Sequence, residues 1–299
     1  MAKKRNLLKE KEIMDEDVVI KSPLQQAMIR FRKNKLAILG GTLLLMLILF
    51  VCFGPIFSKF DPDDIDLFNI LAKPSMAEIL GTDELGRDIF TRLMFGGRVS
   101  LAIGVSSALF AISLGTLIGA IAGYYGGIID TALMRFTDLV LTIPSLPLLM
   151  ILGGIFKPSP ALLVFMISIL NWMATARLVR SKFLTLRTLD YVKAARAIGC
   201  KNGRIIFSHL LPNSLGPIIV TATLTVGRAI ISESTLSFLG VGINPPTASW
   251  GNMLQSAQSN MTTAPWMAIA PGLMILITVL AINFLGDGLN DAFDPKRNE

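Results

Sequence analysis

The stretch TLDYVKAARAIGCKNGRIIFSHLLPN, at residues 188–213, is the most polar and most basic part of the second half of the chain. Apolar runs flank it on both sides. Its first half has apolar residues at the spacing i, i+3, i+4 and i+7, which places them on one face of a helix. They are Tyr191, Ala194, Ala195 and Ile198. The pattern predicts a short amphipathic helix that exposes two alanines between two membrane segments.

Neighbouring residues predict where this helix begins and ends. Asp190 is expected to cap its N-terminus, and Gly199 is expected to end it in the left-handed conformation. Asn202 is expected to cap a second helix. That helix should end near Pro212, because proline cannot continue a helix.

Small side chains let another backbone approach closely, so the alanine face suits the groove of a partner protein. A helix hairpin packed only against its own chain fits the pattern equally well. A DNA-binding helix-turn-helix has a similar order of short helix, turn and second helix. It is disfavoured, because both flanks enter the membrane nearby and no dimerising domain is left over.

The composition indicates a membrane protein with several spans. Of the 299 residues, 52% are hydrophobic and 16% are charged, and the mean hydropathy is +0.61. Soluble domains average about 25% charged residues. Cys52 lies in the first apolar run and Cys200 in the basic loop, so no disulfide is expected. The net charge of +7 follows from where the loops lie and does not predict a nucleic-acid partner.

The sequence also lacks the common signatures of catalytic and metal sites. It has no CxxC, HExxH or Walker-type phosphate loop, and it has a single histidine, His209. We therefore expect no catalytic residues, no metal and no cofactor bound by this chain, and we expect it not to be an enzyme.

Charge asymmetry predicts that the N-terminus lies in the cytoplasm. Residues 1–35 carry ten lysines and arginines against five acids, and such an excess stays on the inner side of a membrane. Residues 24–35 can form a basic amphipathic helix on the inner leaflet. Residues 36–58 are uncharged and predict the first transmembrane helix.

An acidic extracytoplasmic loop is expected at residues 59–97. Its segment TDELGRDIFTRLMFGGRVS has helical charge spacing and predicts an interfacial helix that leads into the next span. The expected ion pairs are Asp88 with Arg92 and Glu84 with Arg87.

Residues 98–288 are expected to form a five-helix core, with a basic cytoplasmic loop at about 178–213 and a cytoplasmic tail at 289–299. The predicted spans are about 99–129, 132–153, 160–177, 214–235 and 267–286. Pro144 and Pro147 are expected to kink the third span of the chain. The fold class is therefore an all-α membrane protein with six transmembrane helices and both termini in the cytoplasm.

The uncharged segment 236–265 is rich in turn-forming residues. It predicts a re-entrant or interfacial segment on the outer side, with Trp250 and Trp266 as anchors at the interface.

Three stretches resemble one family. Residues 188–213 resemble the EAA loop of permease subunits in binding-protein-dependent ABC importers, with Ala194-Ala195, three residues, Gly199 and then a Leu-Pro ending. Lys193 stands where the family pattern has Glu. Residues 81–101 (GTDELGRDIFTRLMFGGRVSL) resemble the C-type subunit of dipeptide and oligopeptide permeases, and residues 232–246 (SESTLSFLGVGINPP) resemble the same branch.

The resemblance implies a type I ABC importer permease fold in a bacterial or archaeal cytoplasmic membrane. The implied partners are a sister permease, two cytoplasmic ABC ATPases that bind ATP and Mg, an extracytoplasmic binding protein and membrane lipid. The implied substrates are di- and oligopeptides, moved by alternating access. The coupling helix that docks on an ATPase would use Asp190, Tyr191, Ala194, Ala195, Arg196 and Gly199.

Two ionisable residues in the fifth span are candidates for the translocation pathway, because charge in a membrane is costly and often functional. Arg228 and Glu233 are five residues apart and do not share a face, and either can meet a charged end of a peptide. The alternatives remain open at this point. Arg228 can pair with a carbonyl or reach the interface, and Glu233 can sit at the water boundary.

Rival functions also remain. Importers of nickel or of other small solutes share these motifs. An ion-coupled secondary transporter would need carboxylates within the membrane, and only Asp138 and Glu233 come close, both near the ends of spans. A membrane enzyme would need a polar cluster at one depth.

Overall fold

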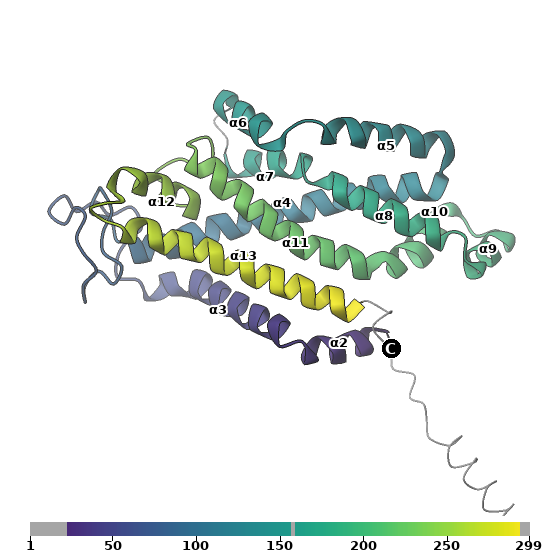
Figure 1. Ribbon diagram of the computed structural model, residues 1–299, viewed down its shortest axis with the longest axis horizontal. Coiled ribbons are helices and arrows are strands. Elements are labelled where there is room, and N and C mark those ends of the chain that lie inside the picture. The colour runs from purple at the N-terminus through teal and green to yellow at the C-terminus, as the bar shows by residue number, and fades with distance from the viewer. Residues whose placement is uncertain (1–22, 157–158, 294–299) are drawn as a thin grey trace, which may run out of the picture.

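The computed structural model describes residues 23–156 and 159–293, and over these residues the chain is built of helices joined by loops. One isolated β-bridge joins Thr82 and Asp88. Figure 1 shows the helices running roughly along the long axis of the molecule. In chain order they are α2 (Pro23–Lys33), α3 (Lys35–Phe57), α4 (Ile89–Tyr125), α5 (Gly127–Leu141), α6 (Ser145–Phe156), α7 (Pro160–Ile169), α8 (Trp172–Leu186), α9 (Asp190–Ala197), α10 (Asn202–Ile205), a π-helical turn (Ile206–Leu210), α11 (Leu211–Phe238), α12 (Trp250–Ala257), a 3₁₀ turn (Gln258–Asn260) and α13 (Trp266–Phe293).

Four helices are long and apolar enough to cross a membrane: α3, α4, the continuous run Asn202–Phe238 that contains α11, and α13. Two further candidates are bent pairs. The helices α5 and α6 meet at 75°, and α7 and α8 meet at 44°. The described residues therefore contain four to six candidate spans. The kink expected at Pro144 is confirmed, because the break between α5 and α6 lies there, whereas Pro147 sits in the first turn of α6 and breaks nothing.

Small residues let α4 and α8 pack closely. Gly115, Gly119 and Gly123 stand one turn apart on α4 and face α8. A Cβ on Gly115 would lie 2.5 Å from the carbonyl oxygen of Trp172, and a Cβ on Gly119 would meet the carbonyl oxygen of Ala176. Close approach through small residues is the usual way in which membrane helices associate, because lipid provides no hydrophobic drive between them.

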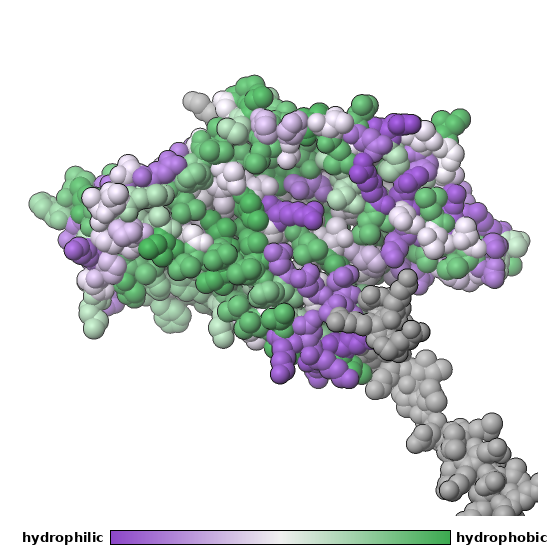
Figure 2. All heavy atoms as spheres, in the orientation of Figure 1, coloured by the Kyte–Doolittle hydropathy of each residue, from purple (hydrophilic) through white to green (hydrophobic). Residues whose placement is uncertain are grey.

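The surface is apolar around the middle of the molecule and polar toward its ends (Figure 2). Large hydrophobic side chains are exposed along the long helices, for example Met46 on α3 and Leu109 on α4. Figure 1 also shows that α2 and the end of α13 point toward the end of the molecule that holds α9. This is the arrangement expected when all three lie on one side of a membrane.

The loop between α3 and α4 corrects two predictions. Asp88 caps α4 by accepting from the Thr91 N–H at 2.7 Å, and the helix runs from Ile89 into the span without a break. The predicted helix does lead into the span, but it begins only at Ile89, because residues 82–88 are not helical. The Asp88–Arg92 pair is wrong. Arg92 instead pairs with Asp63 at 3.2 Å. The pairing of Glu84 with Arg87 is confirmed at 3.5 Å.

The segment between α11 and α13 folds as α12, which packs against both of these helices and against α4. Trp250 is fully buried, and its indole N–H donates to the Leu93 carbonyl at 2.9 Å. The prediction that Trp250 anchors an interface is therefore wrong, because its ring fills the core between α4 and α12. Trp266 is partly buried at the start of α13.

Candidate functional site: the coupling segment and the membrane-embedded charges

The sequence-predicted helix at the centre of the basic loop is α9. Its first helical residue is Asp190, and the residue at the capping position is Leu189, so the prediction of Asp190 as the cap is wrong. The Asp190 side chain instead pairs with Lys193 at 3.1 Å, on the exposed side of the helix. Gly199 has φ +83°, which confirms the left-handed ending after α9.

The two adjacent alanines of α9, Ala194 and Ala195, face different environments. Ala195 is only 6% exposed and packs with Val192 in a core cluster that also contains Phe183 and Leu210. The expectation that Ala195 lies on the exposed face is therefore wrong, because that side of α9 covers the end of the helix bundle. Ala194 is exposed.

An apolar strip stays uncovered on α9. It consists of Tyr191, Ala194 and Ile198, which stand at i, i+3 and i+7. Ile198 is 81% exposed and Tyr191 is 42% exposed. The exposed apolar strip therefore lies at the polar end of the molecule. We call these three residues the docking strip.

Side chains attach α9 to the end of α4. The Tyr124 hydroxyl donates to Asn202 Oδ1 at 2.7 Å, and the Arg196 guanidinium lies 5.1 Å from the centre of the Tyr124 ring. Arg187 Nη1 donates to the carbonyl oxygens of Gly123 and Tyr124 at 3.1 and 3.2 Å. A cation on these last carbonyls satisfies them and complements the helix dipole. The sequence analysis did not find Tyr124 and Arg187, because nothing in the linear pattern brings them to this loop.

The second helix of the loop continues into the membrane. It begins at Asn202, with Lys201 at the capping position, and passes through the π-helical turn into α11. The prediction that Asn202 is the cap and the prediction that the helix ends near Pro212 are both wrong. Pro212 lies in the first turn of α11, where a missing N–H is tolerated. The His209 ring packs near that of Tyr191, with 6.4 Å between ring centres.

Glu233 is fully buried, so the alternative that it sits at a water boundary is wrong. It accepts from Ser100 at 2.9 Å and from Ser237 at 2.8 Å. These two hydroxyls in turn accept backbone N–H groups, from Trp250 at 3.2 Å and from Ile243 at 3.0 Å. The carboxylate thus joins α4, α11 and the start of α12, and it faces no open surface.

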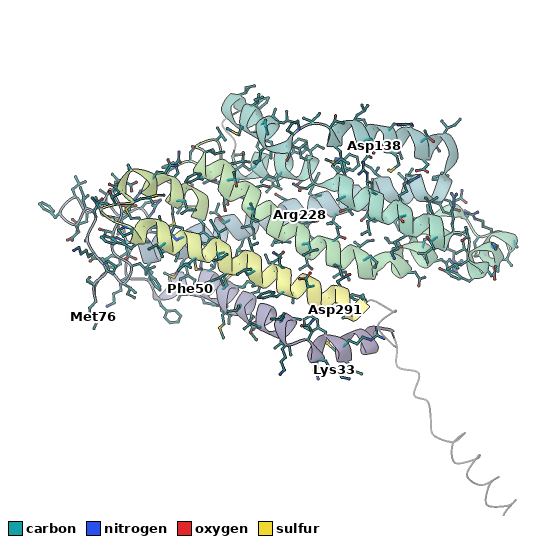
Figure 3. All side chains as sticks on the ribbon, viewed as in Figure 1. Lys33, Phe50, Met76, Asp138, Arg228 and Asp291 are labelled. Carbon is teal, nitrogen blue, oxygen red and sulfur yellow. The ribbon has the colours of Figure 1, made fainter. Side chains whose placement is uncertain are left out.

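Arg228 is exposed on the middle of α11. Figure 3 labels it, and Figure 2 shows a hydrophilic patch at the same place with apolar surface around it. Within residues 23–156 and 159–293, its guanidinium makes no hydrogen bond or ion pair, so the alternative in which it pairs with a carbonyl is wrong, and the alternative in which it reaches the interface stays open. The structure does not bring Arg228 and Glu233 together, since one points out of the bundle and the other into it.

Other charged groups are paired within the chain. Asp130 of α5 binds Arg180 of α8 through two contacts, at 2.5 and 2.7 Å, and Asp138 binds Arg177 at 2.5 Å. In the described part of the chain, no group of three or more His, Cys, Asp or Glu side chains is placed to hold a metal ion.

Long apolar helices, joined by a basic loop that presents a partly exposed helix at one end, define a multi-pass membrane protein. Comparison with known proteins gives the family. Residues 115–299 match the binding-protein-dependent transport system inner membrane component, and residues 22–74 match the N-terminal TM domain of oligopeptide transport permease C. The chain belongs to this family of ABC importer permeases, which are non-catalytic components of the bacterial inner membrane.

Individual relatives align over most of their length. The dipeptide transport system permease protein DppC of Alkalihalophilus pseudofirmus is 44% identical over 92% of this chain and 90% of its own. The oligopeptide transport system permease protein OppC of Bacillus subtilis is 40% identical over 91% and 89%. The glutathione transport system permease protein GsiD of Pectobacterium atrosepticum is 40% identical over 94% and 93%.

Proposed function

We propose that this chain and a sister permease form the translocation pathway for di- and oligopeptides, which an extracytoplasmic binding protein delivers. Two cytoplasmic ATPases bind ATP and Mg and drive the cycle. The names of the relatives, which include dipeptide, oligopeptide and glutathione permeases, support a peptide substrate. An importer of nickel or another small solute is the alternative within the same class.

The proposed topology has six spans, with each bent pair counted as one, and both termini in the cytoplasm. The basic loop that carries α9 then also faces the cytoplasm, as its excess of cations favours. The segment between α11 and α13 faces outward.

The observation that carries the proposal is the docking strip on α9. An exposed apolar strip at the proposed cytoplasmic end suits a partner's groove. On its other side α9 packs through Val192 and Ala195 into the end of the bundle, and its Arg196 guanidinium lies 5.1 Å from the centre of the Tyr124 ring of α4. A groove in the ATPase that receives this strip can therefore pass its movement to the membrane helices. Lys193, in place of the family's Glu, pairs with Asp190 of its own helix.

A co-purification experiment tests this assignment. The chain is tagged in its native host, and the substitution is Ala194→Asp rather than a change at the buried Ala195. We expect the ATPases to co-purify with the native chain. With Ala194→Asp we expect their yield and ATP-driven peptide uptake to fall about tenfold or more, because the variant buries an unpaired charge in an apolar contact.

Ala197→Asp is the matched control, since it makes the same change at another exposed alanine of α9. Ala197 lies about 100° around the helix from Ile198 and about 60° from Ala194, at the edge of the docking strip and beside Lys193. We expect the ATPases to stay bound in this variant. Co-purification that is equal in all three proteins would refute the docking strip. Peptide uptake that persists without ATP would favour an ion-coupled transporter.

A further inference from the structure

The two sides of α11 differ in chemistry. One side lines an apolar cavity of about 340 Å³ shared with α3, α4 and α13, to which α11 contributes Ile219, Ala222, Thr223 and Val226. Arg228 projects from the opposite side, about 180° around the helix from Ile219. The apolar side suits hydrocarbon or another helix, whereas the opposite side carries the charge of Arg228, with Ile231 exposed one turn from it.

Hydroxyl groups accompany Arg228 on its side. Thr221, Ser232 and Thr235 stand at i−7, i+4 and i+7 from it and share its face. Each hydroxyl donates to a carbonyl one turn earlier in α11: Thr221 to Pro217 at 2.9 Å, Ser232 to Arg228 at 2.9 Å, and Thr235 to Ile231 at 2.7 Å. Their hydrogens are therefore engaged, while their oxygens keep lone pairs that can accept from a ligand N–H. We call Thr221, Arg228, Ser232 and Thr235 the polar stripe.

In the proposed topology, Arg228 lies within the membrane and away from both of its surfaces. It lies ten residues before the end of α11 at Phe238, which is about 15 Å along the helix axis and about half the thickness of the hydrocarbon layer. An arginine side chain is much shorter than that. A cation at this depth needs a water-filled path or an anion beside it.

The acidic residues of α11 indicate whether Arg228 has an anion beside it within its own helix. Glu233 is the only acid in α11, and its carboxylate points into the bundle and binds hydroxyls there. We infer that Arg228 binds the C-terminal carboxylate of the peptide in transit, with the hydroxyl oxygens of the polar stripe accepting from peptide N–H groups. This inference rests on the proposed peptide transport. A guanidinium matches a carboxylate through two parallel hydrogen bonds.

The dimensions of the stripe fit a short peptide. Thr221 and Thr235 each lie seven residues from Arg228, which is about 10 Å along the axis. Three residues of an extended peptide cover about the same length.

The test compares three forms of one peptide in the complete importer, reconstituted in vesicles with its sister permease, ATPases and binding protein. The forms are trialanine, trialanine amide and N-acetyl-trialanine. The amide lacks the carboxylate and the acetylated form lacks the amine. Each is supplied well above its measured dissociation constant for the binding protein, so that delivery is equal. ATP-driven uptake is measured with native chain, Arg228→Gln and Arg228→Lys.

We expect Arg228→Gln to lower uptake of trialanine and of the acetylated peptide about tenfold or more, because a charged hydrogen bond is lost. Uptake of the amide should stay as in the native protein. With Arg228→Lys, uptake of trialanine should lie between that of the native importer and that of Arg228→Gln. Lysine keeps the charge but cannot form two parallel hydrogen bonds to the carboxylate.

Equal uptake of all three peptides by native and variant importers would overturn the inference, and so would an equal loss for acid and amide. Loss of the sister permease from the purified Arg228→Gln complex would also overturn it, by assigning the arginine to the contact between permeases. A native importer that moves none of the three peptides would refute the proposed function itself.

Discussion

Glu233 shows how one buried side chain organises several segments. Its two oxygens accept hydroxyl donors from α4 and α11, and those hydroxyls accept backbone N–H groups at Ile243 and Trp250. The N-terminus of α12 adds a positive partial charge beside Ser100. A carboxylate held in this way ties the loop after α11 to the two long helices.

Removing this carboxylate should loosen the outer segment. Glu233→Ala leaves buried hydroxyls without an acceptor and should lower the free energy of unfolding by about 2 kcal/mol. Glu233→Gln should have a smaller effect in the same direction, because the amide keeps one acceptor. The measurement is the thermal unfolding midpoint of the purified complex.

A cysteine placed in the outer segment can show whether the loss of the Glu233 carboxylate loosens that segment itself. Ala248 is 6% exposed, so Ala248→Cys should resist maleimide when Cys52 and Cys200 are replaced by serine, and should react when Glu233→Ala is added. Glu78→Gln is the matched control, since Glu78 is partly exposed in the loop between α3 and α4 and its carboxylate accepts from Ser75. If the introduced thiol stays protected in every variant, Glu233 does not hold the segment.

At the scale of the helices, the contact between α4 and α8 depends on glycine. Gly119→Ala places a Cβ against the carbonyl oxygen of Ala176, which belongs to the backbone and cannot turn away. Overpacking of this kind costs about 1–3 kcal/mol, so we expect a lower unfolding midpoint and less assembled importer.

Gly272→Ala in α13 is the control for Gly119→Ala. A Cβ there meets only a Leu254 side-chain atom at 3.9 Å, an ordinary contact. We expect no loss of stability in this variant, because alanine favours helix more than glycine does. A midpoint that falls equally in both variants would show that close packing at Gly119 contributes nothing special.

The helices also show what the sequence could predict. Long apolar runs predicted the spans of α3, α4, α11 and α13, because their composition alone requires a membrane. The 75° break between α5 and α6 could be foreseen only as a proline kink, since the bend angle depends on which neighbours satisfy the freed backbone groups.

Parts of the candidate site were less predictable. Periodicity found α9 but assigned Ala195 to the wrong surface, since only the position of Phe183 and Leu210 decides which side of the helix is covered. Likewise, Glu233 looked like a boundary residue because its hydroxyl partner Ser100 is 133 residues away in the chain.

For the whole molecule, the proposed topology can be tested by labelling. Thr262 is exposed in the segment between α12 and α13. In a Cys52→Ser background, an impermeant maleimide should label Thr262→Cys in cells with permeable outer layers, and should label Cys200 only after the inner membrane is opened. Ser249 is unsuitable as a reporter, because it is fully buried.

The reverse pattern would overturn the proposed orientation, with Cys200 reactive from outside. Labelling of both sites from outside would contradict the number of spans between them. Cys200 is a free, partly exposed thiol, so its protection in intact cells cannot be attributed to a disulfide.

The attachment of α9 has a mechanical consequence. Residues 198–201 connect the helix to α10, and α10 continues through the π-helical turn into α11, while Arg196 of α9 contacts the Tyr124 ring of α4 at 5.1 Å. Under the proposed function, a displacement of α9 therefore reaches α11 through the backbone and α4 through the contact between Arg196 and Tyr124. The backbone connection persists in every variant, whereas the contact with Tyr124 can be removed, so weakening that contact should reduce the movement passed to α4 and leave the path to α11 in place.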